Sequence, residues 1–287
     1  KTDGSYVQTF GGDSFNCAVY LKRSYKKAHV EYISVLGDDD LSSKMMGFFK
    51  KQDLKTSYID KLKNKNSGLY IISTKDGERS FSYYRGEAAA KKLFLTPSLD
   101  KLNKDLLTYD LIYFSAISLA IMSEKGRENL FKIIKKARAL GVKIAFDSNY
   151  RPRLYKNQDD ARAIYSKVIN YCDIFLPSLD DEIELWGETS VDKIIEKSLA
   201  SGVKEIILTC GKEDIIYHHN NLTKTIKTKQ IKNIVDSTSA GDSFNGMYLA
   251  SRLKEKSIKK SIKKAAKLAS KVIMHQGAIM PKENNDK

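Results

Sequence analysis

From residue 110 to residue 208, short apolar runs alternate with longer segments whose apolar residues recur at helical spacing. The runs 110–115, 143–146, 173–176 and 205–208 predict strands, because they are short, apolar and rich in β-branched or aromatic residues. Helices are predicted between and after them, over 123–140, 161–171, 180–186 and 191–200. A strand, a helix and a second strand in that order form a parallel crossover. We therefore expect an α/β fold with a mostly parallel, doubly wound sheet covered by helices.

Two predicted hairpins interrupt this alternation. The first joins the β-rich runs 68–73 and 79–84 through Asp76-Gly77, a pair typical of tight turns between antiparallel strands. The second, over 215–226, turns at Asn220-Asn221. In an α/β protein the first hairpin is either a lid over a ligand or an ordinary edge hairpin, and the pattern alone leaves both interpretations open.

The composition is that of a folded globular protein, because 41% of the 287 residues are hydrophobic and 30% are charged. We expect a single domain over residues 1–287. The longest nearly apolar stretch, 111–122, is too short to span a membrane, and no export leader opens the sequence. The three cysteines lie far apart and lack metal-site spacing, which fits the reducing cytoplasm.

The formal net charge of +15 permits binding to nucleic acid, to a membrane surface or to small anions. The lysines are spread over the whole chain, however. The densest run, over 254–264, has its apolar residues at helical spacing. We interpret that run as the solvent-facing side of a packed helix and expect neither a nucleic-acid nor a membrane partner.

The most informative segment is the turn Asp236-Ser-Thr-Ser-Ala-Gly-Asp242, which follows an apparent strand over 231–235 and opens a helix. Small residues at 239–241 let backbone N–H groups converge at a helix N-terminus, where they and the helix dipole bind anions. The carboxylate of Asp242 would stand beside that site, where a hydroxyl nucleophile must lose its proton. The turn predicts phosphoryl transfer with Asp242 as base, and the alternative is an ordinary tight turn with a first-turn acid.

A second glycine turn, over 10–16, also precedes a helical stretch, over 15–24. Neither turn matches the phosphate-binding loop GxxxxGK[ST], and the dinucleotide-binding pattern GxGxxG is absent. The four histidines show no spacing typical of a metal site, so we assign no metal ligands from the sequence.

The early turn, over 11–16, and the late turn, over 236–242, together resemble the PfkB (ribokinase-like) family of carbohydrate kinases. The resemblance covers nearly the whole chain. Within the family, the strings at 83–90, 146–154 and 277–281 resemble the 2-keto-3-deoxygluconate kinases. The activity that this implies is transfer of phosphate from ATP to the terminal hydroxyl of that sugar acid.

The resemblance also implies a ribokinase-like three-layer α/β/α fold with a small β lid, formed by about 1–10 and 68–86. It implies ATP and Mg²⁺ as cofactors and leaves a monovalent cation open. By analogy with lids that pair between subunits, it implies a homo-oligomer formed through the lid.

The residue roles that the resemblance implies fall into three groups. Asp242 would be the general base, and the anion hole would consist of the N–H groups of Ser239, Ala240, Gly241 and Asp242. The sugar acid would be bound by Gly12, Asp13, Asn16, Tyr70, Tyr83, Arg85, Arg151 and Asp242. The nucleotide would be bound by Asn149, Arg151, Thr209, Gly211, Lys212, Asp214, Ser239 and Gly241. Arginine offers a carboxylate a bidentate fork, whereas we expect the nearby Arg153 to be a surface residue.

Three features depart from the family pattern. Family members usually carry a strand before the early glycine turn, and we expect this strand to be missing from the sequence. Ser178 and Asp181 stand where the family often has Asn and Glu beside the metal and phosphate. Met247 stands where the family usually has Gly or Ala.

Two other functions remain open at this point. One is a sister kinase of the fructokinase or ribokinase type, which would have no need of two arginines for a neutral sugar. The other is a basic nucleic-acid-binding protein without catalysis, although no recognisable nucleic-acid module is present.

Overall fold

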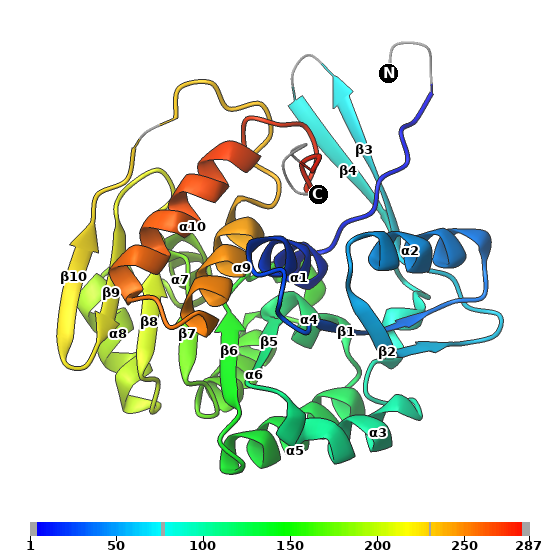
Figure 1. Cartoon of the computed structure of the whole chain (residues 1–287), viewed down its shortest axis with the longest axis horizontal. Helices are drawn as coiled ribbons and strands as arrows, with labels where there is room; N and C mark the ends of the chain where they lie inside the picture. The colour runs from blue at the N-terminus through cyan, green and yellow to red at the C-terminus, as the bar shows by residue number, and fades with distance from the viewer. Residues whose placement is uncertain (1–4, 76–77, 230, 283–287) are drawn as a thin grey trace.

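The computed structural model describes residues 5–75, 78–229 and 231–282. At its centre lies a six-stranded sheet in the order β10-β9-β8-β7-β6-β5 (Figure 1). Strands β5 to β8 are parallel, and β9 and β10 add an antiparallel edge. The strands span Leu111–Ser115 (β5), Lys143–Asp147 (β6), Ile174–Leu176 (β7), Glu205–Leu208 (β8), Ile215–His219 (β9) and Leu222–Ile226 (β10).

Helices cover both faces of this sheet, because alternate side chains of each strand point to opposite cores. In β6, Ile144 and Phe146 join one hydrophobic cluster and Ala145 joins the other. The face with Ala145 is covered by α1 (Asp13–Ser24), α9 (Ala240–Leu253) and α10 (Ile258–Val272). The opposite face is covered by α4 (Ala116–Ile121), α5 (Glu124–Ala139), α6 (Gln158–Ile169), α7 (Leu179–Trp186) and α8 (Val191–Ala200), with α3 (Ser98–Asp105) beyond. The expected three-layer α/β/α fold is confirmed.

Two smaller sheets complete the structure. The parallel pair β1 (Glu31–Leu36) and β2 (Lys55–Lys61) lies beside α2 (Asp40–Lys51). The antiparallel hairpin of β3 (Leu69–Lys75) and β4 (Glu78–Tyr84) projects from the body (Figure 1). Within the described part of the chain, neither pair shares a sheet with the six central strands. The hairpin therefore stands in the position expected of a lid.

Two expected strands do not form, and one expected turn lies outside the described residues. Residues 231–235 form no strand: the N–H groups of Val235 and Asp236 donate to the carbonyl of Ile273, so the segment follows the end of α10 instead of a neighbouring strand. Of the segment 1–10 expected in the lid, residues 1–4 lie outside the described residues, and residues 5–10 form no strand and leave the side chains of Tyr6 and Val7 exposed. The turn residues Asp76-Gly77 lie outside the described residues.

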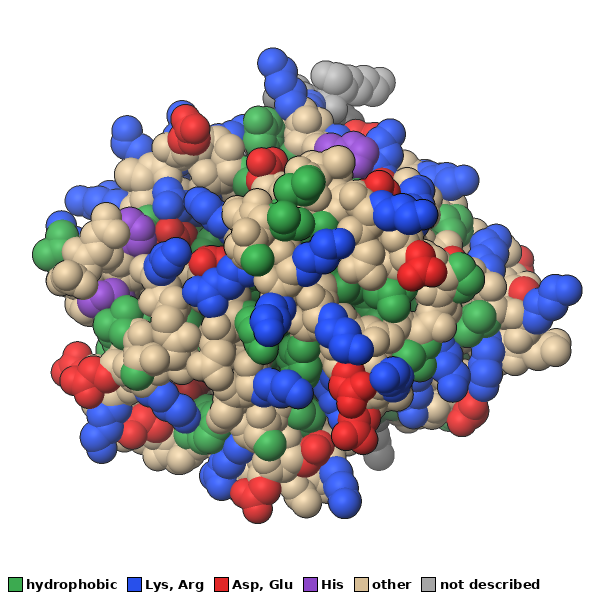
Figure 2. Space-filling model, turned by 90° about the horizontal axis from the view of Figure 1, so that it is seen from below, with side chains coloured by type: hydrophobic (Ala, Val, Ile, Leu, Met, Phe, Trp, Pro, Cys, Tyr) green, Lys and Arg blue, Asp and Glu red, His purple; other side chains and the backbone are tan. Residues whose placement is uncertain are grey.

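The excess positive charge is distributed over the surface. Figure 2 shows Lys and Arg side chains spread across one whole face and interspersed with acidic side chains. The lysine run at 254–264 belongs to α10 only from Ile258 onward, because α9 ends at Leu253 and a short link follows. Ile258 and Ile262 are buried while the lysines of the run are exposed, as expected for a packed helix. Among the described helices, none combines the length and the apolar character needed to cross a membrane.

The two helices that open at the glycine turns, α1 and α9, pack closely against each other. A Cβ atom at Gly246 of α9 would lie 2.5 Å from the carbonyl oxygen of Cys17 and 2.9 Å from the backbone nitrogen of Leu21. Both contacts are with backbone, which cannot rotate away. Only glycine at this position allows the observed approach of the two helices.

We expect Gly246→Ala to destabilise the protein by about 2 kcal/mol or more, because the added methyl group must push the helices apart. Gly47→Ala is the matched control: Gly47 lies in α2, and its Cβ would meet no atom within 4 Å. The control should be neutral or stabilising, by up to about 1 kcal/mol. Urea unfolding of both variants checks this, and equal midpoints would contradict it.

Glu182 of α7 is a buried carboxyl group, only 4% exposed. Burial raises its pKa from 4.5 to about 7, against the opposing effect of the Lys197 charge. Between pH 4.5 and about 7 the unfolded chain therefore binds fewer protons at this residue than the folded chain does. The free energy of unfolding must therefore fall as the pH rises through that window, and it stays at the lower value at higher pH.

We expect Glu182→Gln to remove this loss, because the amide resembles the protonated acid in size and carries no charge. At about pH 8 the variant should exceed the wild type in free energy of unfolding by about 2–3 kcal/mol. At about pH 4 the two proteins should be equally stable. Denaturant titrations at both pH values check this, and a difference that does not depend on pH would contradict it.

Candidate active site

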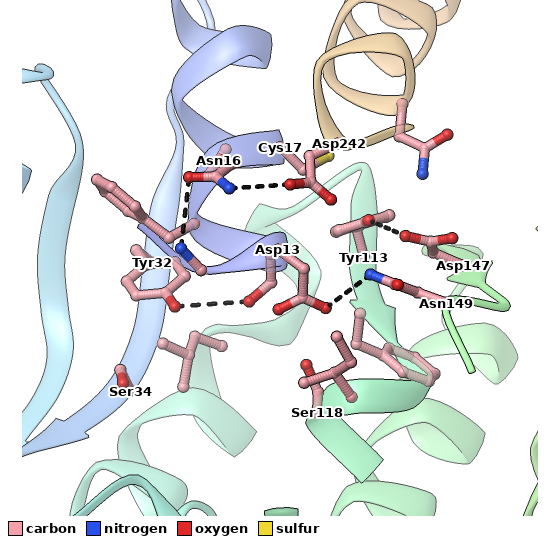
Figure 3. Close-up of a pocket in the computed structure, with 18 of the residues that line it drawn as sticks. Asp13, Asn16, Cys17, Tyr32, Ser34, Tyr113, Ser118, Asp147, Asn149 and Asp242 are labelled. Carbon is pink, nitrogen blue, oxygen red and sulfur yellow. Dashed lines mark hydrogen bonds between the residues drawn. The ribbon is translucent and has the colours of Figure 1, made fainter. Parts of the chain in front are cut away.

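The two glycine turns, more than 200 residues apart in the sequence, meet at the N-termini of α1 and α9 (Figure 3). Asn16 Nδ2 donates a hydrogen bond of 2.9 Å to Asp242 Oδ2. Asn16 Oδ1 accepts from the N–H of Gly12 at 3.4 Å. The side-chain amide of Asn16 thus connects the early turn to the carboxylate of the late turn.

Asp242 has the electrostatic environment of a proton acceptor that works near neutral pH. Burial raises its pKa, the charge of Asp13 raises it further, and the hydrogen bond from Asn16 lowers it; the pKa is about 7. A general base is most effective when its pKa lies near the working pH. The carboxylate can therefore exist in both protonation states under physiological conditions.

The N-terminus of α9 faces the same space as Asp242. Ser239 adopts the left-handed conformation (φ 65°), and Ala240 begins the helix. The N–H of Ala240 donates to the carbonyl of Ser237 at 3.3 Å, so this member of the predicted anion hole is already engaged. A Cβ at Gly241 would meet no atom within 4 Å. Open space at a helix N-terminus suits a phosphate group.

Two further carboxylates, of the half-buried Asp13 and the buried Asp147, lie near Asp242 (Figure 3). Asp13 accepts hydrogen bonds from the Ser115 hydroxyl and, at 3.5 Å, from Asn149 Nδ2. Asp147 accepts from the Tyr113 hydroxyl at 3.0 Å. Burial raises the pKa of both groups, and for Asp147 the charge of Asp242 raises it further. This part of the site is therefore densely acidic in a protein of net positive charge.

The residues of the site line one large cavity of about 2090 Å³. This volume exceeds the 300–1,000 Å³ of typical small-molecule pockets, because the cavity continues from the glycine turns into the space between β1 and β5.

The lid contributes aromatic rings and guanidinium groups to this cavity. Tyr70 of β3 and Tyr83 of β4 are cross-strand partners whose ring centroids lie 6.0 Å apart. The Arg85 guanidinium lies 5.0 Å and 4.8 Å from these two ring centroids. Arg153 contacts Tyr83 from the body, with its guanidinium 3.9 Å from the ring centroid, so the expectation of a plain surface role for Arg153 is incomplete.

The loop after β6 supplies the remaining basic group. Arg151 Nη1 donates to the Tyr150 carbonyl at 2.6 Å and lies 3.7 Å from Asp181 Oδ1. Asp181 also accepts from the Ser148 hydroxyl at 2.5 Å. Arg151 is thus held in place by an acidic partner while it faces the cavity.

The structure brings most of the predicted site residues together. The cavity is lined by Gly12, Asp13, Asn16, Tyr70, Tyr83, Arg85, Asn149, Arg151, Thr209, Ser239, Ala240, Gly241 and Asp242. Gly211, Lys212 and Asp214 are not among its lining residues, and Asp214 Oδ1 accepts a hydrogen bond from the N–H of Thr228. The roles of all these residues stay predictions.

The sequence reasoning missed two residues that orient the buried carboxylates, Tyr113 and Ser115 of β5. Their only signal was their place at the carboxyl end of a predicted parallel strand, where ligands of open α/β sheets bind. For the metal, no group of three or more His, Cys, Asp or Glu side chains in the described ranges is arranged to hold an ion.

Known proteins resemble this chain in sequence and in fold. The sequence matches the pfkB family of carbohydrate kinases over residues 1–285. A 2-dehydro-3-deoxygluconokinase of Dickeya dadantii is 39% identical over 281 residues, covering 96% of this chain and 90% of that protein.

Among solved structures, a 2-dehydro-3-deoxygluconokinase of Thermotoga maritima has a TM-score of 0.84 at 22% identity, covering 96% of this chain and 88% of that one. A candidate ribokinase II of E. coli, solved in complex with ATP and Mg²⁺, has a TM-score of 0.81 at 20% identity, with the same coverage of both chains. These structures share the fold. From the sequence match, this chain belongs to the pfkB family of carbohydrate kinases.

Proposed function

We propose that the protein is an ATP-dependent kinase that phosphorylates the terminal hydroxyl of 2-keto-3-deoxygluconate (2-dehydro-3-deoxygluconate). The observation that carries this proposal is the presence of two arginines, Arg85 and Arg151, in the cavity that also holds Asp242 and the N-terminus of α9. A sugar acid needs cationic partners for its carboxylate, and a neutral sugar does not. The name of the 39% identical relative supports the same substrate.

In the proposed reaction, the Asp242 carboxylate takes the proton of the substrate's terminal hydroxyl. That oxygen forms a bond to the γ-phosphorus of ATP while the bond from the γ-phosphorus to the bridging oxygen breaks and ADP leaves. The first-turn N–H groups of α9, at Gly241 and Asp242, would stabilise the charge on the transferred phosphoryl group. Tyr70 and Tyr83 would hold the sugar from the lid.

The α9 N-terminus fits a nucleotide triphosphate, because the open space at Gly241 and the first-turn N–H groups suit phosphate oxygens. Mg²⁺ bound with ATP would neutralise phosphate charge. Asp147 and Asp181 would be its candidate protein ligands, because Mg²⁺ prefers carboxylate oxygens. Mg²⁺ commonly keeps waters and relies on one or two protein carboxylates, so a dedicated cluster of ligands is not required.

We expect Asp242→Asn to reduce kcat by at least about a thousandfold while ATP binding is retained, because the amide cannot accept the proton. In the wild type, kcat/KM should rise with pH through about 7, since Asp242 must be ionised and its pKa is about 7. Asn16→Ala removes a hydrogen bond to the ionised form, so this rise should move to higher pH by roughly one unit. Coupled ADP-release assays over a pH series check this, and substantial turnover by Asp242→Asn would refute the assignment.

We expect Arg151→Ala to lower kcat/KM for the sugar acid by about 10-fold or more, since a hydrogen bond between charged groups contributes about 1.5–3 kcal/mol. The residual activity on fructose or ribose, if measurable, should change far less. Arg162→Ala is the control, because Arg162 stacks on Trp186 at 5.8 Å and does not line the cavity. Equal losses on acid and neutral substrates would argue for the sister sugar kinase instead.

We also propose a cytoplasmic enzyme, because its three cysteines are free thiols and its second substrate is ATP. A homo-oligomer formed through the lid and a monovalent-cation requirement stay predictions.

A further inference from the structure

A contact between Arg153 and Tyr83 joins the lid to the body of the protein. The Arg153 guanidinium lies 3.9 Å from the centroid of the Tyr83 ring and donates a hydrogen bond to the Tyr83 hydroxyl. Tyr83 belongs to β4, whereas Arg153 lies in a 3₁₀ turn over Pro152–Leu154 that follows β6. The contact therefore bridges two parts that share no sheet.

The body side of this contact is anchored in the core. The 3₁₀ turn is closed by hydrogen bonds from the Leu154 N–H to the Arg151 carbonyl and from the Tyr155 N–H to the Pro152 carbonyl, at 2.9 and 3.1 Å. Tyr155 is buried, and its hydroxyl donates to the carbonyl of Ala116 at 2.8 Å. Arg153 thus extends from a rigid base.

The lid side of the contact is the hairpin of β3 and β4. β3 and β4 pair only with each other among the described strands. The ring of Tyr83 is contacted by two guanidinium groups, that of Arg85 from its own strand end and that of Arg153 from the body. A guanidinium over an aromatic face is stabilising, and the hydrogen bond fixes its place.

The direction of the hydrogen bond between Arg153 and Tyr83 is fixed by the chemistry of the two groups. A guanidinium has donors but no acceptor, so the Tyr83 oxygen must accept from Arg153. The guanidinium of Arg153 thereby occupies one acceptor position of the Tyr83 oxygen.

We propose that Arg153 is a positioning residue, which holds the β3–β4 lid over the cavity through Tyr83. The structural part of this inference is independent of the substrate. Only its kinetic consequence rests on the proposed function.

The first test measures the lid without any substrate, by backbone amide hydrogen exchange of β3 and β4. Arg153→Ala should speed this exchange by roughly three- to fivefold, the equivalent of one lost cation–π contact, while exchange in the central sheet stays unchanged. Arg153→Lys, which keeps a cation and a donor, should restore part of the protection. Arg162→Ala is the matched control and should leave the lid unchanged. Unchanged lid exchange in Arg153→Ala overturns the proposal.

The second test asks whether the effect passes through Tyr83. In a Tyr83→Ala background, adding Arg153→Ala should not speed lid exchange further. A further increase would mean that Arg153 holds the lid by another route and would overturn the assignment to Tyr83.

The kinetic arm uses the sugar acid with the wild type and Arg153→Ala. We expect KM for the sugar acid to rise roughly three- to fivefold, with kcat and KM for ATP little changed. A fall in kcat with unchanged KM would contradict the positioning role. If the wild type does not phosphorylate the sugar acid, the proposed function fails, and the exchange experiments still decide the role of Arg153.

Discussion

The close approach of α1 and α9 is the constraint on which the rest of the site depends. The two helices touch at Gly246 of α9, where an added methyl group would lie 2.5 Å from the carbonyl oxygen of Cys17 in α1. Their N-termini therefore point into one space, and Asn16 reaches Asp242 at 2.9 Å. A separation larger by one methyl group would open that hydrogen bond. The close packing of α1 against α9 inside the protein thus sets the distance between Asn16 and Asp242 in the cavity.

The second constraint is electrostatic. The half-buried Asp13 and Asp242 and the buried Asp147 lie near one another, and desolvation raises the pKa of each. Each is held by a neutral donor: Ser115, Tyr113 or Asn16. The cationic groups of the cavity come from the lid (Arg85) and from the loop after β6 (Arg151). Their charges oppose the rise in pKa: both lower the pKa of Asp13, and Arg151 lowers that of Asp242.

The alternation of apolar runs and amphipathic segments predicted the central strands and most helices, because burial on both faces leaves a clear pattern in the sequence. The run 231–235 misled this reasoning. Its β-branched residues favour a strand, but Ile234 and Val235 are exposed at 43% and 55%, and the backbone bonds to the end of α10 instead. Strand propensity does not create a partner strand. Arg153 is exposed, as expected, but its contact with Tyr83 was not predicted: the partner lies 70 residues away, and no local pattern shows a contact of that kind.

The sequence by itself determined the helix and strand pattern, the two glycine turns and the family, because these depend on local chemistry and on strings of adjacent residues. It also identified Asp242, since a carboxylate beside a small-residue turn is a local arrangement. Only the tertiary structure decided that Asn16 donates to Asp242, that Tyr113 and Ser115 hold the other carboxylates, and that the lid meets Arg153. These contacts join residues from 34 to 226 positions apart, and they exist only because the helices and strands pack at one particular distance.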